Sequence, residues 1–209
     1  MPYLPFLNDP GHIRALEGQR FVVLRPATLD RTYQHVQEAL RRLLRGQLIS
    51  YPARAHVTLC SFAPATPVEV VRDLVRACAV QLPPVELEVV GVSAFPPPFK
   101  TLILNISKRP VLTAAMNALR CEARRNSLTV DETIPVDNWA FHMSLAYCRQ
   151  LDDVGWQGVA EFSKTLSVPR AREVVDCVEV VAYDQGKEYT GGTFQLGGSS
   201  SPVDSNDAV

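Results

Sequence analysis

The stretch "RAHVTLCSF" (54–62) places a titratable histidine at the start of a short apolar segment that predicts a β-strand. A second stretch, "WAFHMSLAYC" (139–148), repeats the same order of residue types: an apolar approach, a histidine, one apolar residue, a hydroxyl residue and a leucine. Side chains alternate between the two faces of a strand, so each histidine is expected to share a face with its hydroxyl residue. The two pairs are His56 with Thr58, and His142 with Ser144.

The segments around these two motifs recur in the same order along the chain. Each half reads strand, helix, motif strand, helix, strand, and the offset between the motif histidines is 86 (142 − 56). The first strands begin at Phe21 and Thr101, an offset of 80 (101 − 21), and the last strands begin at Val85 and Val174, an offset of 89 (174 − 85). A nearly constant offset over three elements indicates an internal duplication. The motif strands of two such lobes are expected to face each other.

The predicted fold class is α+β, with two pseudo-symmetric lobes, each a mainly antiparallel sheet with two helices outside, around a central groove. Helices are predicted over 27–46, 66–81, 109–126 and 155–166. Strands are predicted over 21–26, 55–62, 85–95, 101–107, 140–148, 174–184 and 189–196. We expect an N-terminal arm over 1–20, one bilobal catalytic domain over 21–196 with lobes at about 21–98 and 99–196, and a disordered tail over 197–209.

The composition of the chain limits its partners and its compartment. With 21 Lys+Arg and 22 Asp+Glu, the formal net charge of −1 argues against a protein that coats long duplex nucleic acid. No apolar run approaches the ~20 residues that cross a bilayer, and the first residues lack the basic region of a signal peptide. The five cysteines are widely spread and odd in number, which indicates reduced thiols in a cytoplasmic protein rather than a disulfide or zinc framework.

Two imidazoles and two hydroxyls around one cavity suit chemistry at the phosphorus atom of a phosphodiester. Histidine titrates near neutrality, so one ring can take a proton from the attacking oxygen while the other gives one to the departing oxygen. Thr58 and Ser144 can donate hydrogen bonds to the non-bridging oxygens, whose negative charge grows in the transition state. We expect no metal and no other cofactor, since the sequence offers no convincing ligand cluster. The residues alone do not decide which histidine is the acid.

A single histidine on a half-buried strand is more often a structural residue than a catalytic one. Two features favour the catalytic interpretation here. Both motifs carry the same five-residue pattern, and both fall at the same place in the repeat. The remaining histidines, His12 and His35, lack this pattern.

These motifs resemble those of the two-histidine (2H) phosphoesterase superfamily, whose members carry two His-x-Thr/Ser motifs on strands of two pseudo-symmetric α+β lobes. The resemblance covers about 21–196 and depends on "HVTL" (56–59) and "HMSL" (142–145). It implies that the histidines form the general acid/base pair and that the hydroxyl residues bind phosphate. The residues with these implied roles are His56 and His142, and Thr58 and Ser144, respectively.

The superfamily includes RNA 2′,3′-cyclic phosphodiesterases, historically called 2′–5′ RNA ligases, and enzymes acting on ADP-ribose cyclic phosphate, 2′,5′-oligoadenylates, RNA 3′ ends and cyclic oligonucleotides. The resemblance implies a metal-independent hydrolase of cyclic or 2′–5′ phosphodiesters of nucleotides or RNA ends. In the bacterial RNA branch an arginine and a proline commonly precede the second motif, and "DNWAFH" (137–142) has neither. A nucleotide-binding sensor without turnover is the alternative from another functional class. The expected partner is a nucleotide or RNA-end substrate bound by a monomer, with no membrane.

Three further residues are weaker candidates for substrate contact. Phe99 and Lys100 lie in "FPPPFK" (95–100), between the lobes, where an aromatic ring can stack on a base and an ammonium can meet a phosphate. Phe99 is equally compatible with a position in the core, and Lys100 with a solvated charge at the end of a strand. Phe62 shares the face of the first histidine if its strand is regular, and there it can line the cavity or pack it.

Overall fold

The computed structural model describes residues 10–52 and 54–198. The helices in this part are α1 (Pro10–Leu16), α2 (Leu29–Leu43), α3 (Val68–Ala79), α4 (Pro110–Arg125) and α5 (Asp153–Ser163), with a 3-10 turn at Val136–Asn138. The strands are β1 (Arg20–Leu24), β2 (Val57–Phe62), β3 (Val85–Phe95), β4 (Thr101–Ile106), β5 (His142–Tyr147), β6 (Arg172–Val175), β7 (Cys177–Asp184) and β8 (Lys187–Gln195). The four predicted helices and all predicted strands are present, and the strand predicted over 174–184 is divided into β6 and β7.

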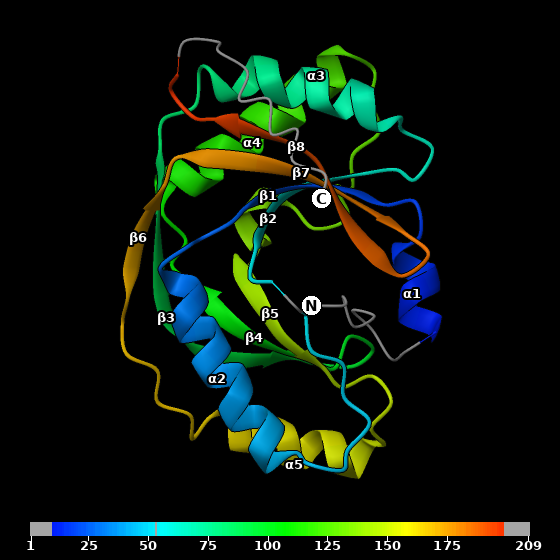
Figure 1. Cartoon of the computed structure of the whole chain (residues 1–209), viewed down its shortest axis with the longest axis vertical. Helices are drawn as coiled ribbons and strands as arrows, with labels where there is room; N and C mark the ends of the chain where they lie inside the picture. The colour runs from blue at the N-terminus through cyan, green and yellow to red at the C-terminus, as the bar shows by residue number, and fades with distance from the viewer. Residues whose placement is uncertain (1–9, 53, 199–209) are drawn as a thin grey trace, which may run out of the picture.

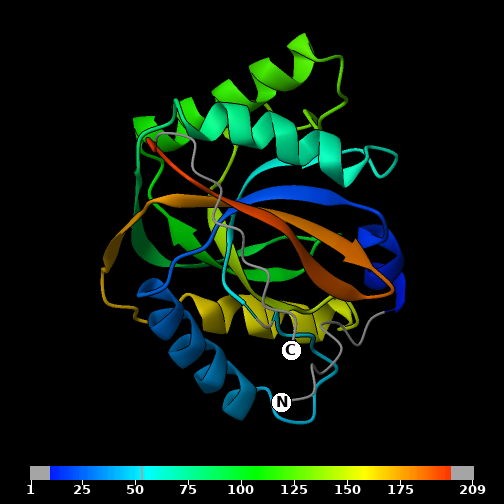
Figure 2. The same cartoon turned by 45° about the horizontal axis from the view of Figure 1, so that its top comes forward.

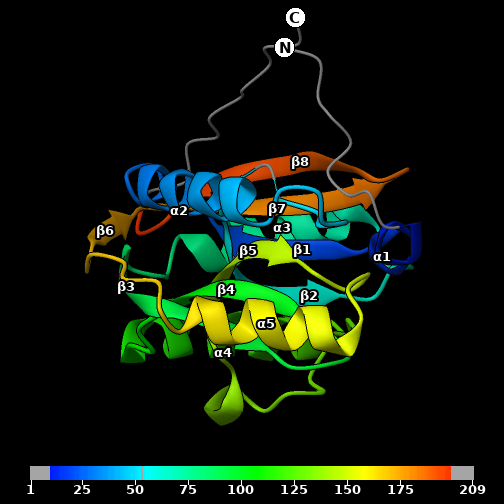
Figure 3. The same ribbon diagram turned by 90° about the horizontal axis from the view of Figure 1, so that it is seen from below.

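The strands form two antiparallel four-stranded sheets with the orders β2-β1-β7-β8 and β5-β4-β3-β6, which we call the first and the second sheet. α3 and α4 cover the first sheet at the top of Figure 1, and this end of the molecule comes forward in Figure 2. α2 and α5 cover the second sheet at the bottom of Figure 1, the side that Figure 3 views. The prediction of an α+β fold with two lobes is confirmed.

The two sheets do not follow the two halves of the sequence. β3, from the first half, lies in the second sheet beside β4, while β7 and β8, from the second half, complete the first sheet beside β1. The helices are exchanged as well, because α2 packs against β5 and α4 packs against β2. The predicted lobe boundary at about 98/99 thus does not coincide with the boundary between the sheets. An apolar pattern identifies a strand but not its partner, so the exchange is invisible in the sequence. The two-fold pattern survives, with β1, β2 and β7 equivalent to β4, β5 and β3.

A helix cap and a tight turn are two local features of the fold. The carboxylate of Glu173, in β6, accepts hydrogen bonds from the backbone N–H groups of Ala27, Thr28 and Leu29 at 2.7–2.8 Å, which caps the N-terminus of α2. The hairpin predicted between the last two strands is present, and its turn residues Gln185 and Gly186 both have positive φ, as a tight two-residue turn requires.

Both motif strands contain a β-bulge at the same position of the motif. The extra residue is Leu59 in β2 and Leu145 in β5; both are buried, and they are 86 positions apart (145 − 59). A bulge reverses the alternation of faces beyond it. The next residues on the histidine faces are therefore Ser61 and Tyr147. Phe62, predicted on this face from a regular strand, is instead 1% exposed and part of the apolar core, so the prediction that it lines the site is wrong.

A continuous apolar core joins the two lobes, and a smaller apolar cluster lies on the histidine face of the first sheet. The buried members of this smaller cluster are Val23, Val181 and Tyr183. Ile13 and Leu16 of α1 pack against it, which explains why these residues of the predicted irregular arm form a helix.

Other predictions for the ends of the chain, over 1–9 and 199–209, lie outside the described residues. Within the described part of the chain, none of the helices is long and apolar enough to cross a membrane.

Candidate active site

The two motif histidines stand at the beginning of equivalent strands. His56 immediately precedes β2, and His142 is the first residue of β5. Both are partly exposed, as are the hydroxyl residues Thr58 and Ser144 two positions later. The apolar residues that alternate with them are buried, namely Val57, Leu59, Met143 and Leu145. The predicted alternation of faces is therefore present up to the bulge.

The fold brings the two histidines to one place. β2 and β5 contact each other although they belong to different sheets. Positive charge on the ring of His142 lowers the pKa of His56, so the two rings lie within electrostatic reach of each other. Two residues that are 86 positions apart (142 − 56) thus belong to one site.

The ring of His142 is held by a backbone carbonyl and by an aromatic side chain. Its Nδ1 atom lies 2.8 Å from the carbonyl oxygen of Ala140, which can only accept, so Nδ1 carries a proton and donates it. Nε2 is therefore the nitrogen that is left for other contacts. Phe95, at the end of β3, packs edge-to-face on the ring with 4.8 Å between centroids. Burial lowers the pKa of His142, and the Ala140 carbonyl opposes that shift by stabilising the protonated ring.

The surroundings of His56 are less favourable to a charged ring. Its Nδ1 atom is buried and has no hydrogen-bond partner among the residues that the structure describes. Burial, then the nearby guanidinium of Arg25, then the ring of His142 lower the pKa of His56 to about 3. Glu179 acts in the opposite direction, and Arg54 adds a smaller lowering effect. His56 is therefore neutral at neutral pH.

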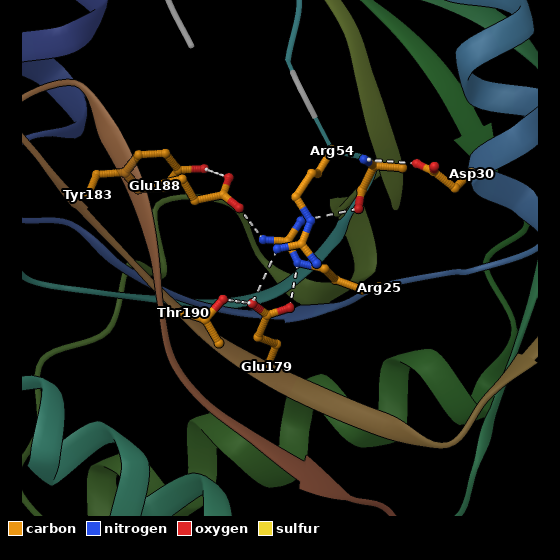
Figure 4. Close-up of polar contacts among 8 residues, drawn as sticks. Arg25, Asp30, Arg54, Glu179, Tyr183, Glu188 and Thr190 are labelled. Carbon is orange, nitrogen blue, oxygen red and sulfur yellow. Dashed lines mark hydrogen bonds and ion pairs between the residues drawn. The ribbon is translucent and has the colours of Figure 1, made fainter. Parts of the chain in front are cut away.

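A buried ionic network borders the first histidine (Figure 4). The guanidinium of Arg25 donates from Nε to a carboxylate oxygen of Glu179 at 2.5 Å and from Nη2 to Glu188. The side chains of Arg25, Glu179 and Glu188 are 9%, 7% and 8% exposed. The Nη1 atom of the guanidinium donates to the backbone carbonyl of Ala55, the residue before the histidine, at 3.3 Å. The network is thus joined directly to the backbone that positions His56.

Further groups hold the two carboxylates of this network in place. The Thr190 hydroxyl donates to Glu179, and the Tyr183 hydroxyl donates to Glu188 at 2.9 Å. The half-exposed guanidinium of Arg54 lies 3.9 Å from Glu179. Apart from Asp30 of α2, the residues labelled in Figure 4 lie on β7 and β8, directly after β1 and shortly before β2, so all four strands of the first sheet help to position them.

The hydroxyl of Ser144 has a neighbour that the bulge supplies. The phenol of Tyr147 lies close enough to this hydroxyl to be affected by it, and burial raises the pKa of the phenol, so it stays protonated. The ring of His12, in α1, packs edge-to-face on Tyr147 at 4.3 Å between centroids. This places α1 beside the second hydroxyl.

Comparison with known proteins agrees with this geometry. The family model described as the 2′-5′ RNA ligase superfamily matches residues 26–187, which include both histidine motifs. The chain belongs to this superfamily of two-histidine phosphoesterases. Among curated proteins, no sequence matches the chain.

Solved structures show the superfamily fold at low sequence identity. TT0787 of Thermus thermophilus is 19% identical with a TM-score of 0.60, and the match covers 87% of this chain and 100% of that one. E. coli LigT, solved with NADP+, is 15% identical with a TM-score of 0.59, and the match covers 85% of this chain and 96% of that one. A structure described as a phosphoesterase is 14% identical with a TM-score of 0.60, covering 85% and 97%.

Outside the superfamily motifs, the structure does not gather the weaker candidates at the histidines. The ammonium of Lys100 donates to the carbonyl of Leu151 at 2.7 Å and to Asp153 at 3.0 Å, which ties the loop between β3 and β4 to the start of α5. Lys100 is thus neither a solvated charge nor a free phosphate ligand. Phe99 is 58% exposed, so it is not a core residue, and its stacking on a base remains a prediction.

The described residues contain no group of three or more His, Cys, Asp or Glu side chains arranged to hold a metal ion. The described cysteines are free, and burial raises the pKa of both Cys60 and Cys148 to about 12, so neither is an activated nucleophile.

Five residues of the candidate site were missed by sequence reasoning. They are Arg25, Phe95, Tyr147, Glu179 and Glu188. The strand patterns contained them, but their neighbours depend on which strands pair and on the bulge. One signal was present: Arg25 and Tyr147 are polar residues that directly follow apolar strand positions, the former after the first strand and the latter in the second motif strand.

Proposed function

We propose that the protein is a metal-independent phosphodiesterase that hydrolyses cyclic or 2′–5′ phosphodiesters of nucleotides or RNA ends. The observation that carries this proposal is the pair of equivalent His-x-hydroxyl units, each beginning a strand with a bulge at the same leucine and coupled through their imidazoles. Membership of a phosphoesterase superfamily supports it.

In the proposed reaction one neutral imidazole accepts a proton from water as its oxygen attacks phosphorus. The bond from phosphorus to the departing ribose oxygen breaks, and the second imidazole protonates that oxygen. Thr58 and Ser144 donate hydrogen bonds to the non-bridging oxygens, where negative charge accumulates. The phenol of Tyr147, close to the Ser144 hydroxyl, is expected to help orient it toward the phosphate. Each proton transfer contributes about 10²–10⁴ in rate.

The nucleotide character of the substrate is supported by a structural neighbour. E. coli LigT has been solved with NADP+, with ATP and with 3′-AMP. The net charge of −1 supports small ligands or single RNA ends over long duplexes. We accordingly propose a monomeric, cytoplasmic enzyme that acts on nucleotides or RNA ends without a cofactor.

A substrate panel tests the proposal. It contains 2′,3′-cyclic mononucleotides, 2′–5′ dinucleotides, cyclic dinucleotides and ADP-ribose cyclic phosphate, each assayed with a chelator present. We expect turnover of at least one member, unaffected by the chelator. His56→Ala and His142→Ala are each expected to lower kcat/KM by about 10²–10⁴.

His35→Ala provides the matched control, because His35 is exposed on α2 and lacks the motif. Its activity is expected to equal that of the wild type. Binding without turnover would indicate a nucleotide sensor instead, and full activity in either motif variant would refute the mechanism.

A further inference from the structure

The strand registers show that each histidine has an equivalent neighbour on the adjacent strand. Asn105 of β4 pairs with His142. In the other lobe, Leu24 of β1 pairs with Val57, so Arg25 stands one position further on, alongside His56. The offset between the first strands is 80, and Arg25 and Asn105 are separated by the same offset (105 − 25). The two lobes therefore differ at this equivalent position, which holds a cation in one and a neutral amide in the other.

The partners of these two neighbours are equivalent as well. Glu179 of β7 lies opposite Val23, as Ser93 of β3 lies opposite Ile103. In the first lobe Arg25 donates to Glu179 at 2.5 Å. In the second lobe the Ser93 hydroxyl donates to the side-chain carbonyl of Asn105 at 3.0 Å. One pair of positions thus carries a buried ion pair beside the first histidine and a neutral hydrogen bond beside the second.

The remaining contacts of the two rings differ in the same sense. An imidazolium has two N–H donors and needs an acceptor for each. Nδ1 of His142 has the Ala140 carbonyl as its acceptor, whereas the buried Nδ1 of His56 has none in the described part of the chain. The charged groups that act on His56 are Arg25, Arg54, Glu179 and the ring of His142, and the effect of Arg25 exceeds that of Glu179. The groups described around His142, namely Phe95, Asn105 and the Ala140 carbonyl, are neutral.

We propose that Arg25, clamped by Glu179 and Glu188, is a positioning residue that fixes His56 as the general base and leaves His142 as the general acid. This assignment rests on the proposed phosphodiesterase function and deepens it. The Nε2 atom of neutral His56 takes the proton of the attacking water. Protonated His142 gives the proton on its Nε2 to the departing ribose oxygen. The two rings then exchange these protons with solvent before the next turnover.

The first test reads the order of protonation without any substrate. Imidazole resonances of the free protein are followed by NMR from pH 8 to about pH 2, so that a midpoint of about 3 for His56 lies within the range. We expect His142 to be half-protonated at a higher pH than His56. The reverse order overturns the assignment whether or not the protein turns over a phosphodiester.

A second test replaces the charged residues beside His56 by neutral ones, as in the other lobe. The triple variant Arg25→Asn, Glu179→Ser, Glu188→Gln is expected to move the midpoint of His56 upward by about one pH unit, since removing a cation at this range favours the charged ring. Arg25→Lys keeps the cation and is expected to keep the wild-type midpoint. Arg42→Asn, an exposed arginine of α2 paired with Glu38, is the matched control and leaves both midpoints unchanged. An unmoved midpoint in the folded triple variant overturns the role of Arg25.

The third test separates acid from base by the leaving group. A nitrophenyl phosphodiester releases a weakly basic oxygen and needs little help from an acid, whereas a 2′,3′-cyclic nucleotide releases a ribose alkoxide. His142→Ala is expected to lose about 10²-fold or more on the cyclic substrate and less than about 10-fold on the nitrophenyl substrate. His56→Ala is expected to lose about 10²-fold on both. If His56→Ala, rather than His142→Ala, keeps most of its activity on the nitrophenyl substrate, the assignment of acid and base is reversed. If the wild-type protein turns over none of the substrates, the proposed function is refuted.

Discussion

The two halves of the site have the same geometry and different electrostatics. Both place a histidine at the start of a strand, a hydroxyl residue on the same face and a bulge at the following leucine. Beside the histidine, the first lobe has the buried ion pair of Arg25 with Glu179, and the second has the hydrogen bond of Ser93 to Asn105. Strand register therefore preserves the position of the reactive groups, while the neighbouring strands set their charge.

The largest effect on stability is expected from removing the cation beside His56. Arg25→Ala leaves two buried carboxylates, Glu179 and Glu188, without their common partner. Breaking a buried ion pair in this way costs about 3–5 kcal/mol of unfolding free energy. Asn105→Ala, the equivalent change in the other lobe, loses one neutral hydrogen bond and is expected to cost about 1 kcal/mol. Urea unfolding at pH 7 measures both, and equal losses would contradict the distinction between the lobes.

A smaller effect concerns the pH dependence of stability. The folded pKa of His56, about 3, lies below the ordinary value of 6.5, so the unfolded chain binds a proton that the folded chain rejects. The free energy of unfolding therefore decreases as the pH falls below about 6.5. His56 accounts for a decrease of about 2 kcal/mol between pH 7 and pH 5.

His56→Gln is expected to remove this part of the dependence of the unfolding free energy on pH. His142→Gln is expected to change the slope in the same direction but by less, because the Ala140 carbonyl offsets part of the burial effect. Unfolding free energies at the two pH values measure the difference. The comparison between the lobes fails if His142→Gln has the larger effect.

The smallest expected effect lies just beyond the bulges. Tyr147→Phe removes the phenol that lies close to the Ser144 hydroxyl, and the loss of one orienting hydrogen bond of about 1 kcal/mol corresponds to roughly 5-fold in kcat/KM. Ser61 occupies the equivalent position of β2, and Ser61→Ala is expected to stay within about 2-fold of the wild type. Steady-state kinetics on the best substrate of the panel measures both. Equal losses would mean that the phenol has no special role.

The sequence allowed the histidines, their hydroxyl partners and the α+β class to be predicted, because a repeated motif and alternation of faces are local properties. It did not allow the bulges to be predicted, since an extra residue is recognised only against the partner strand. Phe62 was misplaced for this reason. Glu179 is 154 residues from Arg25, and a contact at that separation follows only from the pairing of β1 with β7. The exchange of strands between the halves escaped prediction for the same reason.

This exchange of strands has a consequence for folding during translation. β1 and β2 are synthesised early, yet the edge of β1 that binds β7 must wait until about 160 more residues have followed. During that interval the nascent chain exposes an unpaired strand edge with apolar side chains, a natural target for chaperones. The first sheet is thus complete only after β7 and β8 have been synthesised, so a chain that stops before β7 lacks half of this sheet.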